Sequence, residues 1–161
     1  MQALLDMSPM ARPFDEIKAM IEVVMSKHRV PNLIGSPGMG KSDMVRKIAK
    51  EYNLYLIDFR LGQADITDLL GFSFIDKETN QARYVPMATF PIESTPIPEG
   101  YDGFLLFMDE FTHASPSVQK AAFKPILDHM IGEFKLHPQC FIVLGGNKMS
   151  DASGVEEMPQ A

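Results

Sequence analysis

Residues 35–42 read GSPGMGKS, and this stretch decides the fold that the rest of the sequence predicts. It matches the pattern G-x-x-x-x-G-K-[ST], with an apolar segment before it and an amphipathic run after it. Glycines let a backbone turn so that its N–H groups converge, and the start of a helix adds a positive dipole end. The stretch therefore predicts a strand–loop–helix unit that cradles phosphate. The alternative is a flexible glycine turn.

The loop itself supplies most of the expected ligands of a nucleotide. In such a unit the Lys41 ammonium reaches the outer phosphates, and the Ser42 hydroxyl binds Mg²⁺. The residues expected to surround the nucleotide are Gly35, Ser36, Pro37, Gly38, Met39, Gly40, Lys41, Ser42 and Asp43.

Hydrophobic periodicity predicts further strands and helices on both sides of the loop. The predicted helices cover residues 14–25, 41–50, 66–70 and 117–131, the last with a kink at Pro125. The predicted strands cover residues 30–34, 54–59, 104–108 and 140–144, the last three of them buried, and residues 72–75 and 82–85 are expected to form a hairpin. The proline-containing residues 86–100 predict a loop.

This alternation predicts an α/β fold, with a mostly parallel sheet between two layers of helices. Residues 13–161 are expected to form one domain, preceded by an arm over residues 1–12. Ligands of such sheets bind beyond the carboxyl ends of the strands. Polar residues that follow an apolar run are therefore the first candidates for chemistry.

Composition narrows the class of protein. The 161 residues are 45% apolar, which suits a globular domain, and the net charge of −6 makes nucleic acid an unlikely partner. Cys140 is the single cysteine, so one chain can form neither a disulfide nor a cysteine-based zinc site. The sequence shows no signal peptide and no apolar run of about 20 residues. We therefore expect a cytoplasmic protein without a membrane span.

A second candidate element is FLLFMDE, residues 104–110, an apolar run that ends in two carboxylates. Beside a phosphate loop, Asp109 is expected to hold Mg²⁺. Glu110 is placed to act as the general base that activates the attacking water. The alternative for this pair is a helix N-cap followed by an acidic first turn.

A third element is LGGNK, residues 144–148, in which Asn147 follows an apolar run. Its amide could orient the water or contact the outermost phosphate from the side opposite the loop. The alternative is an ordinary turn, since Asn and Gly are favoured there.

In this order, the phosphate loop, the strand ending in Asp-Glu and the strand ending in Asn resemble the AAA+ ATPases, over roughly residues 14–159. Three segments are similar to the MoxR-like branch of that group: 61–72 (LGQADITDLLGF), 109–132 (DEFTHASPSVQKAAFKPILDHMIG) and 147–159 (NKMSDASGVEEMP). Within the first, residues 65–71 match the D-x-x-D-L-x-G element of the branch. Residues 72–86 resemble its inserted β-hairpin.

The resemblance implies an AAA+ P-loop NTPase that binds ATP and Mg²⁺ and hydrolyses ATP. It makes Lys41 and Ser42 the Walker A pair, Asp109 and Glu110 the Walker B acids, and Asn147 the first sensor. It further implies a homo-oligomer, a hexameric ring in the family, that remodels a protein client.

Phe74 and Tyr84 of the hairpin could grip a threaded client polypeptide. The alternative is that they pack the hairpin against its own domain.

The sequence also departs from the family pattern. Where many members read DE-x-N-R-A, residues 109–114 read DEFTHA. In the family, an arginine finger, a fifth core strand and a helical lid follow the element at residues 158–161. The expected fold therefore lacks the fifth strand and the lid, either because the sequence is a fragment or because it is a natural truncation.

Two other functions fit the same residues. One is a P-loop phosphotransferase that moves phosphate to a small acceptor. The other is a nucleotide-regulated binding module with little turnover. An arginine finger contributes about 10³–10⁵ in rate, and the family's arginine finger comes after the last element that the sequence matches.

Overall fold

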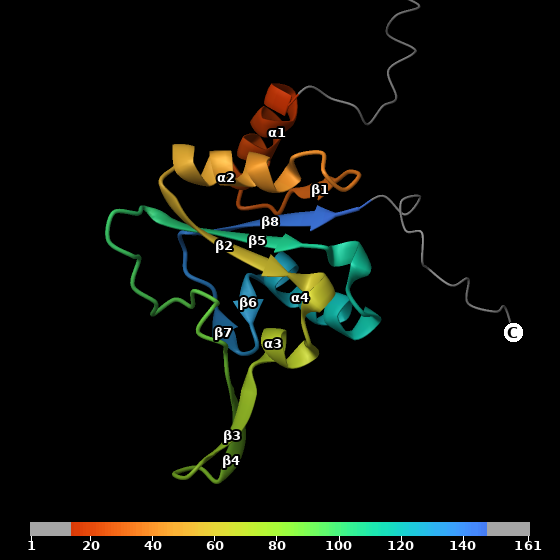
Figure 1. Ribbon diagram of the computed structural model, residues 1–161. Helices are drawn as coiled ribbons and strands as arrows, with labels where there is room; N and C mark the ends of the chain where they lie inside the picture. The colour runs from red at the N-terminus through yellow and green to blue at the C-terminus, as the bar shows by residue number, and fades with distance from the viewer. Residues whose placement is uncertain (1–13, 148–161) are drawn as a thin grey trace, which may run out of the picture.

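The computed structural model describes residues 14–147, and its centre is a four-stranded parallel sheet (Figure 1). The strand order is β1-β8-β5-β2, and every neighbouring pair is parallel. The strands are β1 (Asn32–Ile34), β2 (Leu54–Arg60), β5 (Gly103–Asp109) and β8 (Cys140–Gly146).

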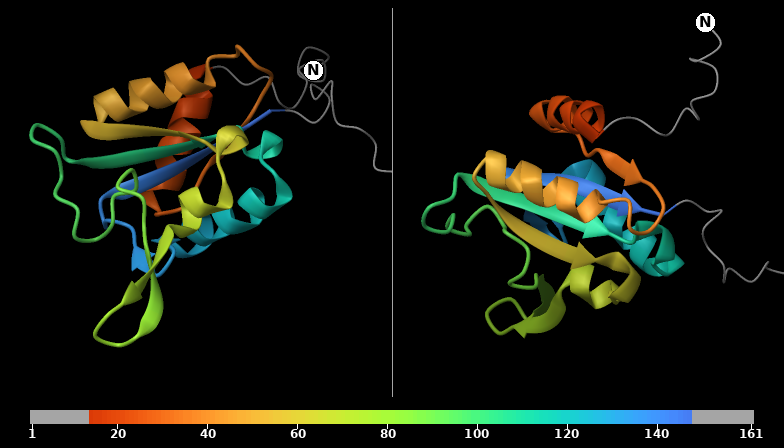
Figure 2. Two further views of the ribbon diagram at one scale, coloured as in Figure 1. Left: turned by 60° about the horizontal axis from the view of Figure 1, so that its bottom comes forward. Right: turned by 45° about the horizontal axis from the view of Figure 1, so that its top comes forward.

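Helices cover both faces of this sheet, as the sequence predicted. In Figures 1 and 2, α1 (Phe14–Ser26) and α2 (Lys41–Glu51) lie over one face of the sheet, and α3 (Ile66–Leu70) and α4 (Pro116–Asp128) lie over the other. The three-layer α/β architecture is therefore confirmed.

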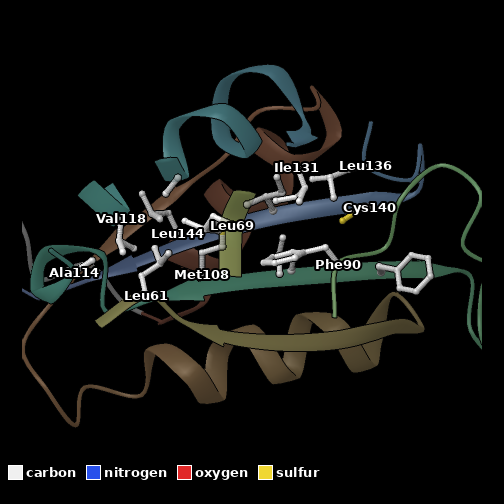
Figure 3. Close-up of a cluster of buried hydrophobic side chains, with 14 residues drawn as sticks. Leu61, Leu69, Phe90, Met108, Ala114, Val118, Ile131, Leu136, Cys140 and Leu144 are labelled. Atoms are coloured by element: carbon white, nitrogen blue, oxygen red, sulfur yellow. The ribbon is translucent and has the colours of Figure 1, made fainter. Parts of the chain in front are cut away.

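Strand β5 shows why the core has two halves. Its side chains alternate in direction, so Leu105 and Phe107 pack among residues of α1 and α2. Leu106 and Met108 pack into the opposite cluster with residues of α3 and α4, which Figure 3 shows. Because both faces are covered, the whole strand is buried until Asp109, at its carboxyl end.

Strand β2 was expected to be buried, and this prediction is wrong. Of its seven residues only Leu54 is fully buried. The reason is its place in the sheet: β2 is an edge strand, so one side has no neighbouring strand. An apolar run does not distinguish an edge position from a central one.

The helix predicted over residues 117–131 ends earlier than expected. α4 continues past Pro125 and stops at Asp128, where His129 adopts a left-handed conformation with φ of 52°. Met130 and Ile131 instead form strand β6, which pairs with a second short strand. The two strands are β6 (Met130–Ile131) and β7 (Phe134–Lys135). The apolar spacing continued the helical period, but Gly132 with φ of 55° turns the chain back.

The predicted hairpin is present and projects from the body of the molecule (Figure 1). Its strands are β3 (Phe72–Asp76) and β4 (Gln81–Val85). Phe74 is 46% exposed and Tyr84 is 43% exposed, so neither side chain is buried against its own domain.

Two 3₁₀ turns complete the part that bears on the site, η2 (Leu61–Gln63) and η3 (Phe111–His113). Residues 86–100 form a loop whose one bridge joins Ile92 to Leu136. The predicted arm over residues 1–12 and the residues after Asn147 lie outside the described part. None of the helices described between residues 14 and 147 has the length and apolar character that a membrane span needs.

Candidate functional site

The loop between β1 and α2 has the conformation that its glycines predict. Gly38 has φ of 79° and Gly40 has φ of 81°, a region that other residues enter at a cost. Gly40 is the N-cap of α2, and its carbonyl accepts a hydrogen bond of 2.9 Å from the N–H of Met44. The loop thus leads directly into the positive end of an eleven-residue helix.

Lys41 lies at the mouth of this loop and joins it to the end of β8. Its Nζ donates to the carbonyl oxygens of Gly35 at 2.6 Å and Ser36 at 3.2 Å. It also donates to Oδ1 of Asn147 at 2.9 Å. Lys41 and Asn147 are therefore in contact although they are 106 positions apart in the sequence. A separate sequence pattern predicted each of them.

Asp109 ends β5, the strand beside β8. One carboxylate oxygen accepts the backbone N–H of Glu110 at 2.8 Å. The same oxygen lies so close to Gly145 that a Cβ there would overlap it. The Asp109 carboxylate therefore packs against Gly145 of β8, two positions before Asn147.

Glu110 follows in an unusual backbone conformation. Its φ of 60° and ψ of 29° are left-handed, which is uncommon for a residue other than Gly, Asn or Asp. Its carboxylate faces the end of β2, where Oε1 is 3.4 Å from Nη1 of Arg60. Gly62 has no Cβ, and this leaves room for the carboxylate. A Cβ at this position would lie 2.6 Å from Oε2.

The structure brings the predicted residues to the end of the sheet where the parallel strands finish, but these residues do not all contact one another. Lys41 and Asn147 touch, Asp109 lies beside them on β5, and Glu110 faces the β2 side. Asp43 is directed elsewhere, since its carboxylate pairs with Arg46 at 2.9 Å on an exposed part of α2.

Sequence reasoning missed four residues that contact these groups: Arg60, Gly62, Thr112 and His113. Thr112 and His113 had been noted only as departures from the family pattern. Arg60 is the last residue of the edge strand β2, so the rule that polar groups gather at strand ends could have identified it, whereas Gly62 has no polar side chain for this rule to find.

The donor chemistry fits a magnesium nucleotide. A hydroxyl at Ser42 and a carboxylate at Asp109 are hard oxygen ligands, which Mg²⁺ prefers. Among residues 14–147, no group of three His, Cys, Asp or Glu side chains could hold a metal by itself. Mg²⁺ commonly binds through one or two protein oxygens together with substrate phosphates, and the site agrees with that mode.

The parallel sheet, the loop and the helix that it opens have the arrangement of a P-loop NTPase core. A solved structure of a protein from Cytophaga hutchinsonii, described as a "putative ATPase", is similar to this chain with a TM-score of 0.56 and 18% identity. The match covers 90% of this chain and 41% of that protein, so the chain spans less than half the length of this neighbour. At this identity the likeness shows the fold alone.

No family model matches the sequence, and no curated protein matches it either. The site must therefore indicate the function, because one fold hosts many activities.

Proposed function

We propose that this chain binds ATP with Mg²⁺ at the loop formed by residues 35–42 and hydrolyses it. The observation that carries the proposal is the contact between Lys41 and Asn147 at the mouth of a glycine loop that opens a helix. These two side chains come from segments 106 positions apart, and a phosphate held from two sides would need both of them at one place.

In the proposed reaction water attacks the outermost phosphorus and Glu110 accepts its proton, while the bond from that phosphorus to the bridging oxygen breaks and ADP leaves. Lys41 and the loop N–H groups stabilise negative charge on the phosphate oxygens, and Asn147 orients the outermost phosphate or the water. Mg²⁺, held through Ser42 and Asp109, would neutralise charge on the same oxygens.

Two single substitutions test the site. Lys41→Ala is expected to abolish binding of a fluorescent ATP analogue. Glu110→Gln is expected to keep that binding while reducing phosphate release at least about 100-fold, as loss of a general base does. Lys50→Ala is the matched control, because Lys50 is an exposed lysine on the same helix and should leave both measurements unchanged.

Three results would reject the proposal or redirect it. Full phosphate release by Glu110→Gln would remove the assigned base. A phosphorylated acceptor in place of free phosphate would indicate a phosphotransferase. Tight nucleotide binding with turnover at background would leave a nucleotide-regulated binding module.

We further propose that the module is MoxR-like and uses hydrolysis to remodel a protein client as a ring of identical subunits. The projecting hairpin supports this proposal, since its exposed apolar side chains are available to a second polypeptide. The double variant Phe74→Ser/Tyr84→Ser should keep basal ATP hydrolysis but lose any stimulation by unfolded casein. Thr79→Ala, in the turn of the same hairpin, is the control.

Ring formation has its own measurement. Sedimentation velocity of Glu110→Gln with Mg-ATP should show a nucleotide-dependent oligomer. A monomer at every concentration would contradict the ring.

A further inference from the structure

The turn η3 connects the two acids to α4, and it is held firmly in place. The N–H of His113 donates to the carbonyl of Glu110 at 2.9 Å. Gln119 of α4 then donates its side-chain amide to the carbonyls of Phe111 at 3.1 Å and Ala114 at 3.0 Å. The turn is therefore fixed at both ends, and the side chains that it bears have defined positions.

Two of these side chains contact Asn147. Its backbone N–H donates to Oγ1 of Thr112 at 3.0 Å, and its Nδ2 lies 3.3 Å from Nδ1 of His113. Gly146 makes the approach possible, because a Cβ there would come within 3.2 Å of the Thr112 methyl carbon. The chain thus reaches from β5 across to the end of β8 with two separate hydrogen bonds.

The chemistry of these groups determines which way the Asn147 amide points. An ammonium only donates, so the amide must present its oxygen to Lys41. The amide nitrogen then faces His113, whose Nδ1 must accept, which places the imidazole proton on Nε2. Lys41, Asn147 and His113 therefore form a chain of hydrogen bonds with a single direction.

We propose that Thr112 and His113 are positioning residues, which hold Asn147 in the orientation that the phosphate chemistry needs. This inference rests on the proposed ATP hydrolysis. Thr112 holds the backbone of Asn147, and His113 holds its amide nitrogen, so that the amide oxygen stays directed toward Lys41. Both residues are exposed, and a hydrogen bond between exposed groups contributes little to folding, so their loss should affect turnover more than stability.

The principal test compares His113→Ala with His113→Asn. The Oδ1 of Asn occupies about the place of Nδ1 and can accept the same hydrogen bond, whereas Ala cannot. His113→Ala should lower kcat about 10-fold with KM changed less than about 2-fold, a fraction of the effect of losing a direct transition-state contact. His113→Asn should restore most of kcat. Equal defects in both variants, or none in either, would overturn the proposal.

Thr112 offers a second matched pair. Thr112→Ser keeps the hydroxyl and should behave as the wild type, whereas Thr112→Val keeps the shape and should lose kcat. In an Asn147→Ala background, neither His113→Ala nor Thr112→Val should reduce kcat further, because both act through Asn147. Additive losses in that background would contradict a positioning role.

A measurement without turnover separates this inference from the proposed function. In ¹⁵N-labelled protein, the side-chain amide resonances of Asn147 should shift in His113→Ala and return toward the wild-type position in His113→Asn. If the wild type hydrolyses no ATP, the proposed function fails, but this spectrum still decides whether the hydrogen bond exists. Unshifted resonances would reject the inference even in an active enzyme.

Discussion

At the scale of single residues, Glu110 combines a chemical role with a costly backbone conformation. A left-handed conformation costs a residue with a Cβ roughly 1–2 kcal/mol, and Glu110 has no side-chain hydrogen bond to its own turn that would offset this. Such strain tends to persist where the position of a side chain matters more than stability.

We therefore predict that Glu110→Gly stabilises the protein by about 1 kcal/mol while abolishing ATP hydrolysis, because glycine enters this region freely. Chemical denaturation gives the free energy of unfolding, and phosphate release gives the rate. Glu110→Gln is the control: it keeps the strain, so its stability should match that of the wild type. A Glu110→Gly protein less stable than Glu110→Gln would show that the backbone is not strained.

Cys140 gives a prediction for alkaline pH. Burial raises the pKa of its thiol from 9.0 to about 12. Between these values the unfolded chain loses the proton and the folded chain keeps it, so the free energy of unfolding falls as pH rises. Cys140→Ala should lack this part of the decline, which urea titrations from pH 8 to 11 would measure. All other side chains are the same in both proteins, so their contributions cancel in the comparison.

At the scale of elements, the end of β8 shows how two strands are kept close enough to share a site. Gly145 lies against the Asp109 carboxylate and the Phe107 ring, and Gly146 lies against Thr112. A methyl group at residue 145 would overlap the Asp109 carboxylate and come within 3.0 Å of the Phe107 ring, whereas at 146 the nearest atom is a methyl carbon at 3.2 Å.

Gly145→Ala is therefore expected to destabilise the protein by about 1–3 kcal/mol, the usual cost of overpacking, and to displace Asp109. Gly146→Ala should cost less and lower kcat through Thr112. Thermal unfolding and the Mg²⁺ dependence of hydrolysis would measure the two effects. The same apparent Mg²⁺ affinity in Gly145→Ala and the wild type would contradict the assignment of Asp109.

The sequence predicted strands and helices well where the local hydrophobic pattern agrees with their place in the fold. β5 and β8 are central strands, so their apolar runs predicted burial correctly, and the stripe of Met44, Val45, Ile48 and Ala49 placed α2 on the sheet. It failed at β2 and β6, where exposure and chain reversal depend on neighbours that are distant in sequence.

The residues of the candidate site also fall into two groups, those that the sequence could identify and those that it could not. The loop and the residues that end β5 and β8 could be identified because each follows a local pattern. The contacts of Thr112 and His113 could not, because they depend on the spacing between strands and on the direction of a short turn.

The hairpin is an element that the core does not need. Nearly all of its side chains are exposed, and Phe72 and Val85 face each other where it leaves the body. Replacing residues 73–84 with Asn-Gly would close this pair with a two-residue turn. We predict that the shortened protein unfolds within a few degrees of the wild type and binds ATP equally well. Loss of ATP binding would show instead that the hairpin supports the site.

At the scale of the whole molecule, the site lies where the two halves of the core meet. Residues of α1 and α2 pack on one face of the sheet and residues of α3 and α4 on the other, and strands β2, β5 and β8 contribute side chains to both clusters. Lys41 belongs to the first half, whereas η3 leads into α4 of the second. Asn147, at the end of β8, contacts both.

Ligand binding at that junction should therefore stabilise both halves together. At a concentration 100 times its Kd, a nucleotide that binds only the folded state adds about 2.7 kcal/mol to the free energy of unfolding. We predict that Mg-ATP raises the unfolding temperature in one cooperative transition and slows hydrogen exchange in both α2 and α4. Lys41→Ala should abolish both effects and Lys50→Ala neither. Protection confined to α2 would mean that the nucleotide contacts the loop without engaging Asn147, and the two-sided site would then be wrong.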